Sequence, residues 1–167
     1  MSLDAEIEDA AKAVVSAAKN KPLTFAFAES CTGGMVSAAV CGISGASEVF
    51  RGSVVSYQLP IKEKLLGVAA DILYTAEIGA VSSECAEAMA AGAKSQLEAD
   101  IAVSITGIAG PGGEEPGKPV GTVVFGSVTA SGVASFWQHF EGDRSAVRKQ
   151  ACLFALNTLL TAIENVQ

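Results

Sequence analysis

One stretch of the chain places two nucleophilic side chains beside a pair of glycines. Residues 23–34 read LTFAFAESCTGG, so an apolar run ends at Glu29 and is followed by Ser30 and Cys31. An activated hydroxyl or thiol can attack a carbonyl carbon, and nearby backbone N–H groups can hold the oxyanion that forms. The stretch therefore predicts a site for nucleophilic chemistry. A helix N-cap followed by a flexible turn is the non-catalytic interpretation.

The elements expected around this stretch are typical of a ligand site. Leucine and phenylalanine alternate with small residues over 23–28, which predicts a strand covered on both faces. The sequence after Gly33 and Gly34 has helix-like composition, so the turn joins the carboxyl end of a strand to the amino end of a helix. Open α/β sheets bind ligands at such turns. Backbone N–H groups from Thr32 to Gly34 are therefore candidates for binding an oxyanion.

A second glycine-rich turn, TGIAGPGG, occupies residues 106–113 and follows an apolar strand predicted over 100–105. Glycines there let backbone N–H groups approach an anion closely, because a Cβ atom would block the approach. Thr106, Gly107 and Gly110 are therefore candidate substrate-binding residues.

Two arginines begin the last predicted helix. Arg144 and Arg148 are spaced i, i+4, so they share one face of the first turn of that helix. Two adjacent guanidinium groups can bind a phosphate through paired hydrogen bonds. Ordinary charge on a helix surface is the alternative interpretation.

The rest of the chain alternates helices and strands, which predicts a three-layer α/β/α fold. Helices are expected over residues 4–19, 33–41, 61–68, 84–99 and 143–165, and strands over 23–29, 52–57, 100–105, 120–129 and 133–140. Ser82 or Ser83 is the expected cap of the fourth helix, and 71–80 is expected to form a loop or half-turn. The prediction is a single domain over 1–167 with a mixed, mostly parallel sheet and a C-terminal antiparallel hairpin that turns at 130–132.

The composition limits the classes of protein to which the chain can belong. Of its 167 residues 50% are hydrophobic, which is enough for one well-buried core, and the chain is too short for two typical domains. Only 17% are charged, which predicts that a partner subunit covers apolar surface in a homo-oligomer. The net charge of −7 argues against a nucleic-acid partner, because neutralising phosphates requires a basic face.

The sequence also bears on location and on metals. No apolar run is long enough to cross a membrane, and the acidic, amphipathic N-terminus is unlike a signal peptide, so we expect a cytoplasmic protein without membrane attachment. The 4 cysteines are scattered without C-x-x-C spacing, and there is 1 histidine. We therefore expect reduced cysteines and no transition-metal site.

Five ordered motifs give the chain a close resemblance to the CinA carboxyl-terminal domain family from Thr24 onward. They are AESCTGG at 28–34, GSVVSY at 52–57 followed by Lys62 and by LLGV at 65–68, TGIAGPGG at 106–113, KPVGTV at 118–123, and FEGDR with Val147-Arg148 over 140–148. Ordered motifs of this kind are far more specific than any single glycine loop. The chain resembles the stand-alone form of the domain, because no larger domain precedes it.

The resemblance implies an activity and a set of site residues. Characterised members of the family are nicotinamide-nucleotide amidases, so the resemblance implies hydrolysis of the carboxamide of nicotinamide mononucleotide to nicotinate mononucleotide and ammonia, without a metal or cofactor. The family's serine nucleophile falls on Ser30, its tyrosine and lysine on Tyr57 and Lys62, its threonine on Thr106, and its arginine-bearing segment on Arg144 and Arg148.

These assignments suggest a mechanism. An amide carbon is a poor electrophile, so the Ser30 hydroxyl needs a base. The single histidine lies far along the chain in a strand, and we therefore expect Lys62, kept neutral by burial or by a nearby positive charge, to act as that base. Tyr57 is expected to relay a proton or to orient the lysine. Cys31 is the competing nucleophile, because a thiolate forms easily at a helix start. Glu29 either faces the positive pyridinium ring or caps a backbone group.

Two other functions fit parts of the sequence. In a non-catalytic nucleotide-binding module, the two glycine-rich turns would recognise the nucleotide and Ser30 would only cap a helix. The chain could also be a serine hydrolase of another amide or ester. A conventional α/β-hydrolase is disfavoured because the sequence has no G-x-S-x-G motif.

Overall fold

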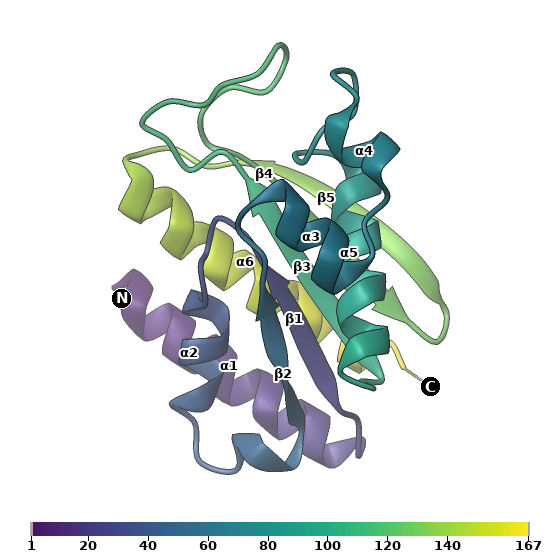
Figure 1. Cartoon of the computed structure of the whole chain (residues 1–167). Coiled ribbons are helices and arrows are strands. Elements are labelled where there is room, and N and C mark those ends of the chain that lie inside the picture. The colour runs from purple at the N-terminus through teal and green to yellow at the C-terminus, as the bar shows by residue number, and fades with distance from the viewer. Residues whose placement is uncertain (1, 167) are drawn as a thin grey trace.

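The computed structural model describes residues 2–166, which contain a five-stranded sheet in the order β2-β1-β3-β4-β5 (Figure 1). The strands are β1 (Phe25–Glu29), β2 (Phe50–Val55), β3 (Ile101–Gly107), β4 (Thr122–Thr129) and β5 (Gly132–His139). β1 is parallel to both β2 and β3, whereas β4 is antiparallel to both β3 and β5. The carboxyl ends of β1, β2 and β3 therefore meet at one edge of the sheet.

Helices cover both faces of the sheet and complete three layers (Figure 1). One layer holds α1 (Leu3–Asn20), α2 (Met35–Cys41) and α6 (Arg144–Glu164), and the other holds α3 (Leu59–Leu66), α4 (Ala70–Tyr74) and α5 (Ser83–Gln96). A short 3-10 turn, η1 (Ala46–Glu48), leads into β2. The predicted α/β/α fold with a mixed sheet and a C-terminal hairpin is confirmed.

β1 forms the centre of the core because both of its faces are buried. Phe25 and Phe27 pack with the layer of α1, α2 and α6, whereas Ala26 and Ala28 pack with the layer of α3 and α5. The alternation follows from the pleat of a strand, in which successive side chains point to opposite faces. The small alanines let the second layer approach the sheet closely.

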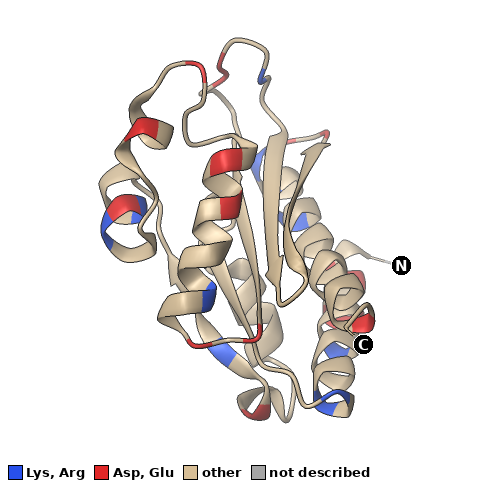
Figure 2. Ribbon diagram, turned by 90° about the vertical axis from the view of Figure 1, so that its right-hand side faces the viewer, with Lys and Arg blue, Asp and Glu red and all other residues tan. Residues whose placement is uncertain are grey.

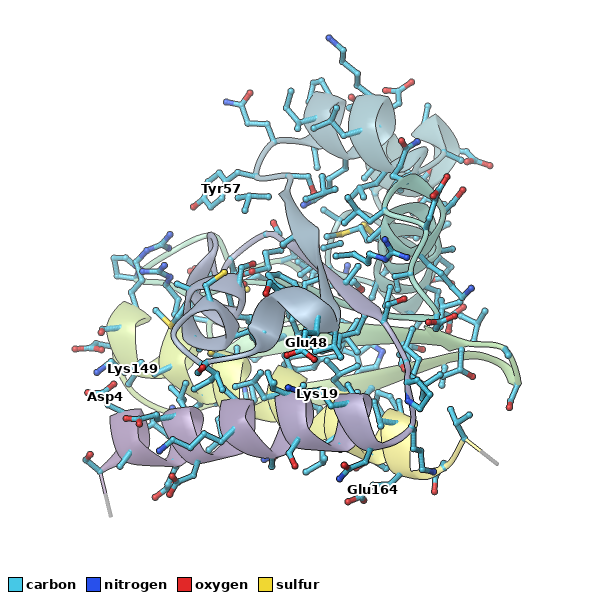
Figure 3. All side chains as sticks on the ribbon, turned by 90° about the horizontal axis from the view of Figure 1, so that it is seen from below. Asp4, Lys19, Glu48, Tyr57, Lys149 and Glu164 are labelled. Carbon is cyan, nitrogen blue, oxygen red and sulfur yellow. The ribbon has the colours of Figure 1, made fainter. Side chains whose placement is uncertain are left out.

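Ion pairs and a carbonyl contact fix the long helices at their ends (Figure 3). Lys149 of α6 pairs with Asp4 of α1 at 2.6 Å, and Lys19 of α1 pairs with Glu48 of η1 at 2.7 Å. The ammonium group of Lys21 donates to the carbonyl of Glu164 at 2.7 Å. These contacts are exposed, so each contributes about 1 kcal/mol or less.

Two local predictions differ from the structure. The strand expected over 52–57 ends at Val55, so Tyr57 lies in the link to α3, two residues beyond the strand. The loop expected over 71–80 contains α4, which buries Leu73. A helix of 5 residues is too short to show a 3.6-residue periodicity in the sequence. Ser82, rather than Ser83, caps α5 by accepting a hydrogen bond from the amide of Cys85.

Charged residues lie mainly on helices and loops (Figure 2). Within the five strands the charged residues are Glu29 and Arg51, and Glu29 is fully buried. Among residues 2–166, none of the helices combines the length and the apolar character needed to cross a membrane.

Candidate active site

Ser30 directly follows β1 at the edge where the three parallel strands end. The amide of Ser30 donates to the carbonyl of Ile105 in β3 at 3.0 Å, so the sheet ladder holds its backbone. Its side chain continues the alternation of Ala26 and Ala28, which places it on the face covered by α3 and α5. Ser30 is 8% exposed, which leaves it accessible at the edge of the core.

Glu29 organises the turn that follows Ser30. Its Oε2 atom accepts hydrogen bonds from the Thr32 hydroxyl at 2.8 Å and from the Gly34 amide at 2.9 Å, and its Oε1 atom accepts one from the Ser37 amide at 3.0 Å. A carboxylate in this position satisfies orphan donors at the start of α2 and complements the helix dipole. Of the two roles considered for Glu29, the structure shows the capping contact.

The glycine pair gives the turn its shape, and the amides of both glycines donate hydrogen bonds within the turn. Gly33 and Gly34 have φ angles of 59° and 94°, a left-handed conformation that other residues rarely adopt. The Gly33 amide donates to the Ser30 carbonyl at 3.1 Å, and the Gly34 amide donates to Glu29. In the part of the chain that the structure describes, the amides of Cys31 and Thr32 have no protein acceptor. They are therefore the amides of this turn that are free to bind a ligand oxygen.

Lys62 enters the same region from α3. It is 1% exposed, and its Nζ atom donates to the carbonyl of Ser56 at 2.5 Å. Burial lowers the pKa of Lys62 to about 8, although electrostatic interactions with Cys85 and Cys31 act in the opposite direction. Among the salt bridges of residues 2–166, none involves Lys62. A buried amine without a carboxylate partner suits a general base at neutral pH.

Cys31 is buried in the core. It packs in the apolar cluster of the α1, α2 and α6 layer, on the side of the sheet opposite to the Ser30 side chain. Burial raises the pKa of the Cys31 thiol to about 11, and the charges of Lys62, Arg148 and Arg144 offset this only in part. The thiol is therefore protonated at neutral pH, which disfavours Cys31 as the nucleophile.

The two arginines of α6 contact different parts of the site. Arg148 donates from Nε to the Cys31 carbonyl at 2.9 Å and from Nη2 to the Thr32 carbonyl at 2.7 Å, so it holds the turn after β1 from outside. Arg144 donates from Nη1 to the Gly110 carbonyl at 2.8 Å and from Nη2 to the Tyr57 hydroxyl at 2.9 Å. Tyr57 is 59% exposed and extends outward beyond the end of β2 (Figure 3).

The second glycine-rich turn packs against β4 and opens onto a cavity. The Thr106 hydroxyl donates to the Ala80 carbonyl at 2.7 Å. A Cβ atom on Gly107 would lie 2.7 Å from the Thr122 carbonyl, and one on Gly110, whose φ is 84°, would lie 2.6 Å from Val120. Close packing therefore requires both glycines. A cavity of about 510 Å³ lies beside the turn, lined by residues of the turn and of the start of α6, including Arg144.

The structure thus brings together the residues that the sequence singled out. Ser30 follows β1, Lys62 contacts the carbonyl of Ser56 just beyond the neighbouring strand β2, and Arg144 connects Tyr57 to the second glycine-rich turn. Lys118, the first residue of the KPVGTV motif, donates to the Ile78 carbonyl and pairs with Glu115. Across residues 2–166, no group of three or more His, Cys, Asp or Glu side chains could hold a metal ion.

Sequence comparison gives one matching family and several curated relatives. The model of the CinA C-terminal domain matches residues 7–163. A CinA-like protein from Thermotoga neapolitana is 45% identical over 146 residues, which cover 87% of this chain and 35% of that protein. The match to a CinA-like protein from Thermotoga maritima also covers 35% of that protein. The chain therefore spans about a third of the length of both relatives. The nicotinamide-nucleotide amidohydrolase PncC of Shigella flexneri is 44% identical over 93% of this chain and 94% of its own length.

Solved structures show the same fold. A CinA superfamily protein from Klebsiella pneumoniae matches with a TM-score of 0.91 at 32% identity, covering 96% of this chain and 99% of the other. The competence/damage-inducible protein CihA from Agrobacterium tumefaciens matches with a TM-score of 0.89 at 35% identity, covering 96% of each chain. The similarity therefore extends over almost the whole fold described above.

Proposed function

Because the chain belongs to the CinA C-terminal domain family, we propose that it is an amidohydrolase that removes the carboxamide nitrogen of nicotinamide mononucleotide. A relative named nicotinamide-nucleotide amidohydrolase is similar over nearly the full length of both chains, which supports this reaction. The observation that carries the proposal is Lys62, a buried amine with a pKa of about 8 at the strand edge where Ser30 lies. A role in the salvage of pyridine nucleotides and a cytoplasmic location form part of the proposal.

In the proposed mechanism neutral Lys62 accepts the proton of the Ser30 hydroxyl. The Ser30 oxygen attacks the carboxamide carbon, and the amides of Cys31 and Thr32 hold the oxyanion. The tetrahedral intermediate collapses as the protonated lysine returns its proton to the leaving nitrogen, so ammonia departs and an ester remains on Ser30. Water, deprotonated by Lys62, then hydrolyses the ester and releases nicotinate mononucleotide.

The remaining residues bind the nucleotide or support the turn. We assign the phosphate to Arg144 and to backbone amides of the second glycine-rich turn, because both this arginine and the turn border the cavity of about 510 Å³. Arg148 and Glu29 hold the turn after β1 from its two sides, so both act as positioning residues. Tyr57 orients Arg144 through its hydroxyl group.

The experiment that tests this function measures ammonia release by the purified protein in the presence of a chelator. Nicotinamide mononucleotide, nicotinamide riboside and nicotinamide are compared, and thermal stabilisation by each compound is recorded in parallel. We expect turnover to be fastest with the mononucleotide, because only that substrate carries the phosphate. Thermal stabilisation by the mononucleotide without ammonia release would instead identify a nucleotide-binding module.

A further inference from the structure

A single serine hydroxyl in the core has no hydrogen-bond partner. Ser56 is fully buried, and within residues 2–166 its Oγ atom is the buried side-chain oxygen or nitrogen that lacks a partner. Proteins rarely leave a buried hydroxyl unpaired, because the loss of its hydrogen bonds to water is not compensated. Packing alone therefore does not explain why a side chain with a hydroxyl group occupies this buried position.

The sheet register places Ser56 beside Ser30. Glu29 and Val55 are partners in the parallel ladder, and the Ser56 amide donates to the Glu29 carbonyl at 2.9 Å. Each serine is therefore the next residue after a paired position, and neighbouring strands lie about 4.8 Å apart. Both serines directly follow parallel strands at the same edge of the sheet.

The pleat directs the two hydroxyls to the same face. Ala28 and Val54 pack with the layer of α3 and α5, so Ser30 and Ser56, each two residues later, continue on that face. Lys62 approaches from α3 on the same side, and its Nζ atom donates to the carbonyl of Ser56 itself. The Lys62 amine and the two serine hydroxyls therefore lie near one another at this end of the sheet, and the Ser56 hydroxyl forms no hydrogen bond to either of the other two groups.

We propose that the Ser56 hydroxyl relays the proton between Ser30 and Lys62. As Ser30 attacks, its proton passes to Oγ of Ser56 while the Ser56 proton passes to the lone pair of neutral Lys62. This step forms the bond from Ser30 to the carboxamide carbon and opens the carbonyl double bond, so its products are a tetrahedral oxyanion, an unchanged Ser56 hydroxyl and a lysine ammonium. The reverse transfer delivers a proton to the leaving nitrogen. The relay rests on the proposed amidase function.

The relay predicts that loss of the Ser56 hydroxyl lowers the rate without lowering the stability of the fold. A purely structural role does not predict this combination. Ser56→Ala removes a hydroxyl that has no partner, so the stability of the fold is expected to stay the same or to rise. We expect kcat of ammonia release from nicotinamide mononucleotide to fall about a hundredfold, as for loss of a proton-transfer group. Ser56→Thr keeps the hydroxyl and is expected to restore most of the rate, whereas Ser56→Val, which has the shape of threonine, is not.

Ser104 of β3 provides a matched control. It is also a fully buried serine, but its hydroxyl donates to the Ala86 carbonyl and accepts from the Gly126 amide. Ser104→Ala should therefore destabilise the fold and leave kcat close to the wild-type value. The two serines are thus expected to show opposite combinations of effects on stability and rate.

A second measurement, the titration of Lys62, distinguishes failure of the relay from failure of the proposed function. The titration of Lys62, followed by NMR of the lysine side chain, should move to higher pH in Ser56→Ala, because the neutral amine loses the hydroxyl that donates to its lone pair in the relay. An unchanged titration, or a Ser56→Ala variant with wild-type kcat, would overturn the relay. If the wild-type chain releases no ammonia, the proposed function fails, and the Lys62 titration alone then decides whether Ser56 contacts the lysine.

Discussion

Lys62 is the residue whose protonation state should control the rate. Its pKa is lowered to about 8 by burial, and only the neutral amine can accept the Ser30 proton. We therefore expect kcat/KM to rise about tenfold per pH unit below pH 8 and to level off above it. Initial rates of ammonia release between pH 6 and 9.5 would show this. A profile that is flat across that range would contradict a lysine base.

The same pKa shift predicts how stability depends on pH. An unfolded lysine has a pKa of 10.5, whereas folded Lys62 has one of about 8, so between these values the unfolded chain binds more protons. Wild-type stability should therefore rise with pH in this window, relative to Lys62→Met, by roughly 3 kcal/mol at most. Urea denaturation of both proteins at several pH values measures the difference. Parallel pH profiles would show that Lys62 is not perturbed.

Arg144 and Arg148 should affect different kinetic constants. Arg144 borders the cavity, so Arg144→Ala should raise KM more for nicotinamide mononucleotide than for the riboside, which has no phosphate. Arg148 instead holds the carbonyls of Cys31 and Thr32, so Arg148→Ala should lower kcat about tenfold or more for both substrates. Equal effects of Arg144→Ala on the two substrates would contradict the phosphate assignment.

At the scale of elements, α5 fixes the position of α3 and therefore of Lys62. Gly92 of α5 lies where a Cβ atom would come within 2.1 Å of the Leu66 carbonyl at the end of α3. Gly92→Ala should push α3 outward, destabilise the fold by about 1–3 kcal/mol and lower kcat. Ala91→Ser, at the exposed neighbouring position, is the control and should change neither. A Gly92→Ala variant with normal kcat would show that Lys62 tolerates the displacement.

The elements were largely predictable from the sequence, because their signals are local. The alternation around Phe25 and Phe27, and the helix-forming run after Ser83, depend on near neighbours along the chain. The partners of individual side chains were not predictable. Nothing in the spacing of Glu29 shows that its carboxylate caps α2, and nothing in the sequence shows that the Ser56 hydroxyl lacks a partner. Both facts depend on how separate elements pack.

The candidate site was identified mainly through its motifs, and its internal roles came from the structure. Ser30 and Lys62 are 32 positions apart in the sequence, and only the pairing of β1 with β2, together with the contact of Lys62 to the Ser56 carbonyl, places them at the same end of the sheet. The oxyanion donors were expected from Thr32 to Gly34. Because the amides of Gly33 and Gly34 already donate hydrogen bonds within the turn, the amides of Cys31 and Thr32 are the remaining candidates for this role.

At the scale of the whole molecule, the chemistry is confined to one end of the sheet. A second cavity, of about 560 Å³, lies between β5 and α6 and has no titratable side chain in its lining. Val133, Phe136 and Trp137 of β5 are exposed apolar residues at the opposite edge of the sheet from β2. The homo-oligomer expected from the low share of charged residues stays a prediction.

The most direct test of the central claim is ammonia release from nicotinamide mononucleotide by Ser30→Ala and Cys31→Ala beside the wild-type protein. Ser30→Ala should lose activity at least a thousandfold, on the order of the effect of removing a serine nucleophile. Cys31→Ala should keep most of the activity, because the Cys31 thiol faces the other layer. Near-normal turnover by Ser30→Ala, or complete loss in a folded Cys31→Ala, would contradict a Ser30 nucleophile activated by Lys62.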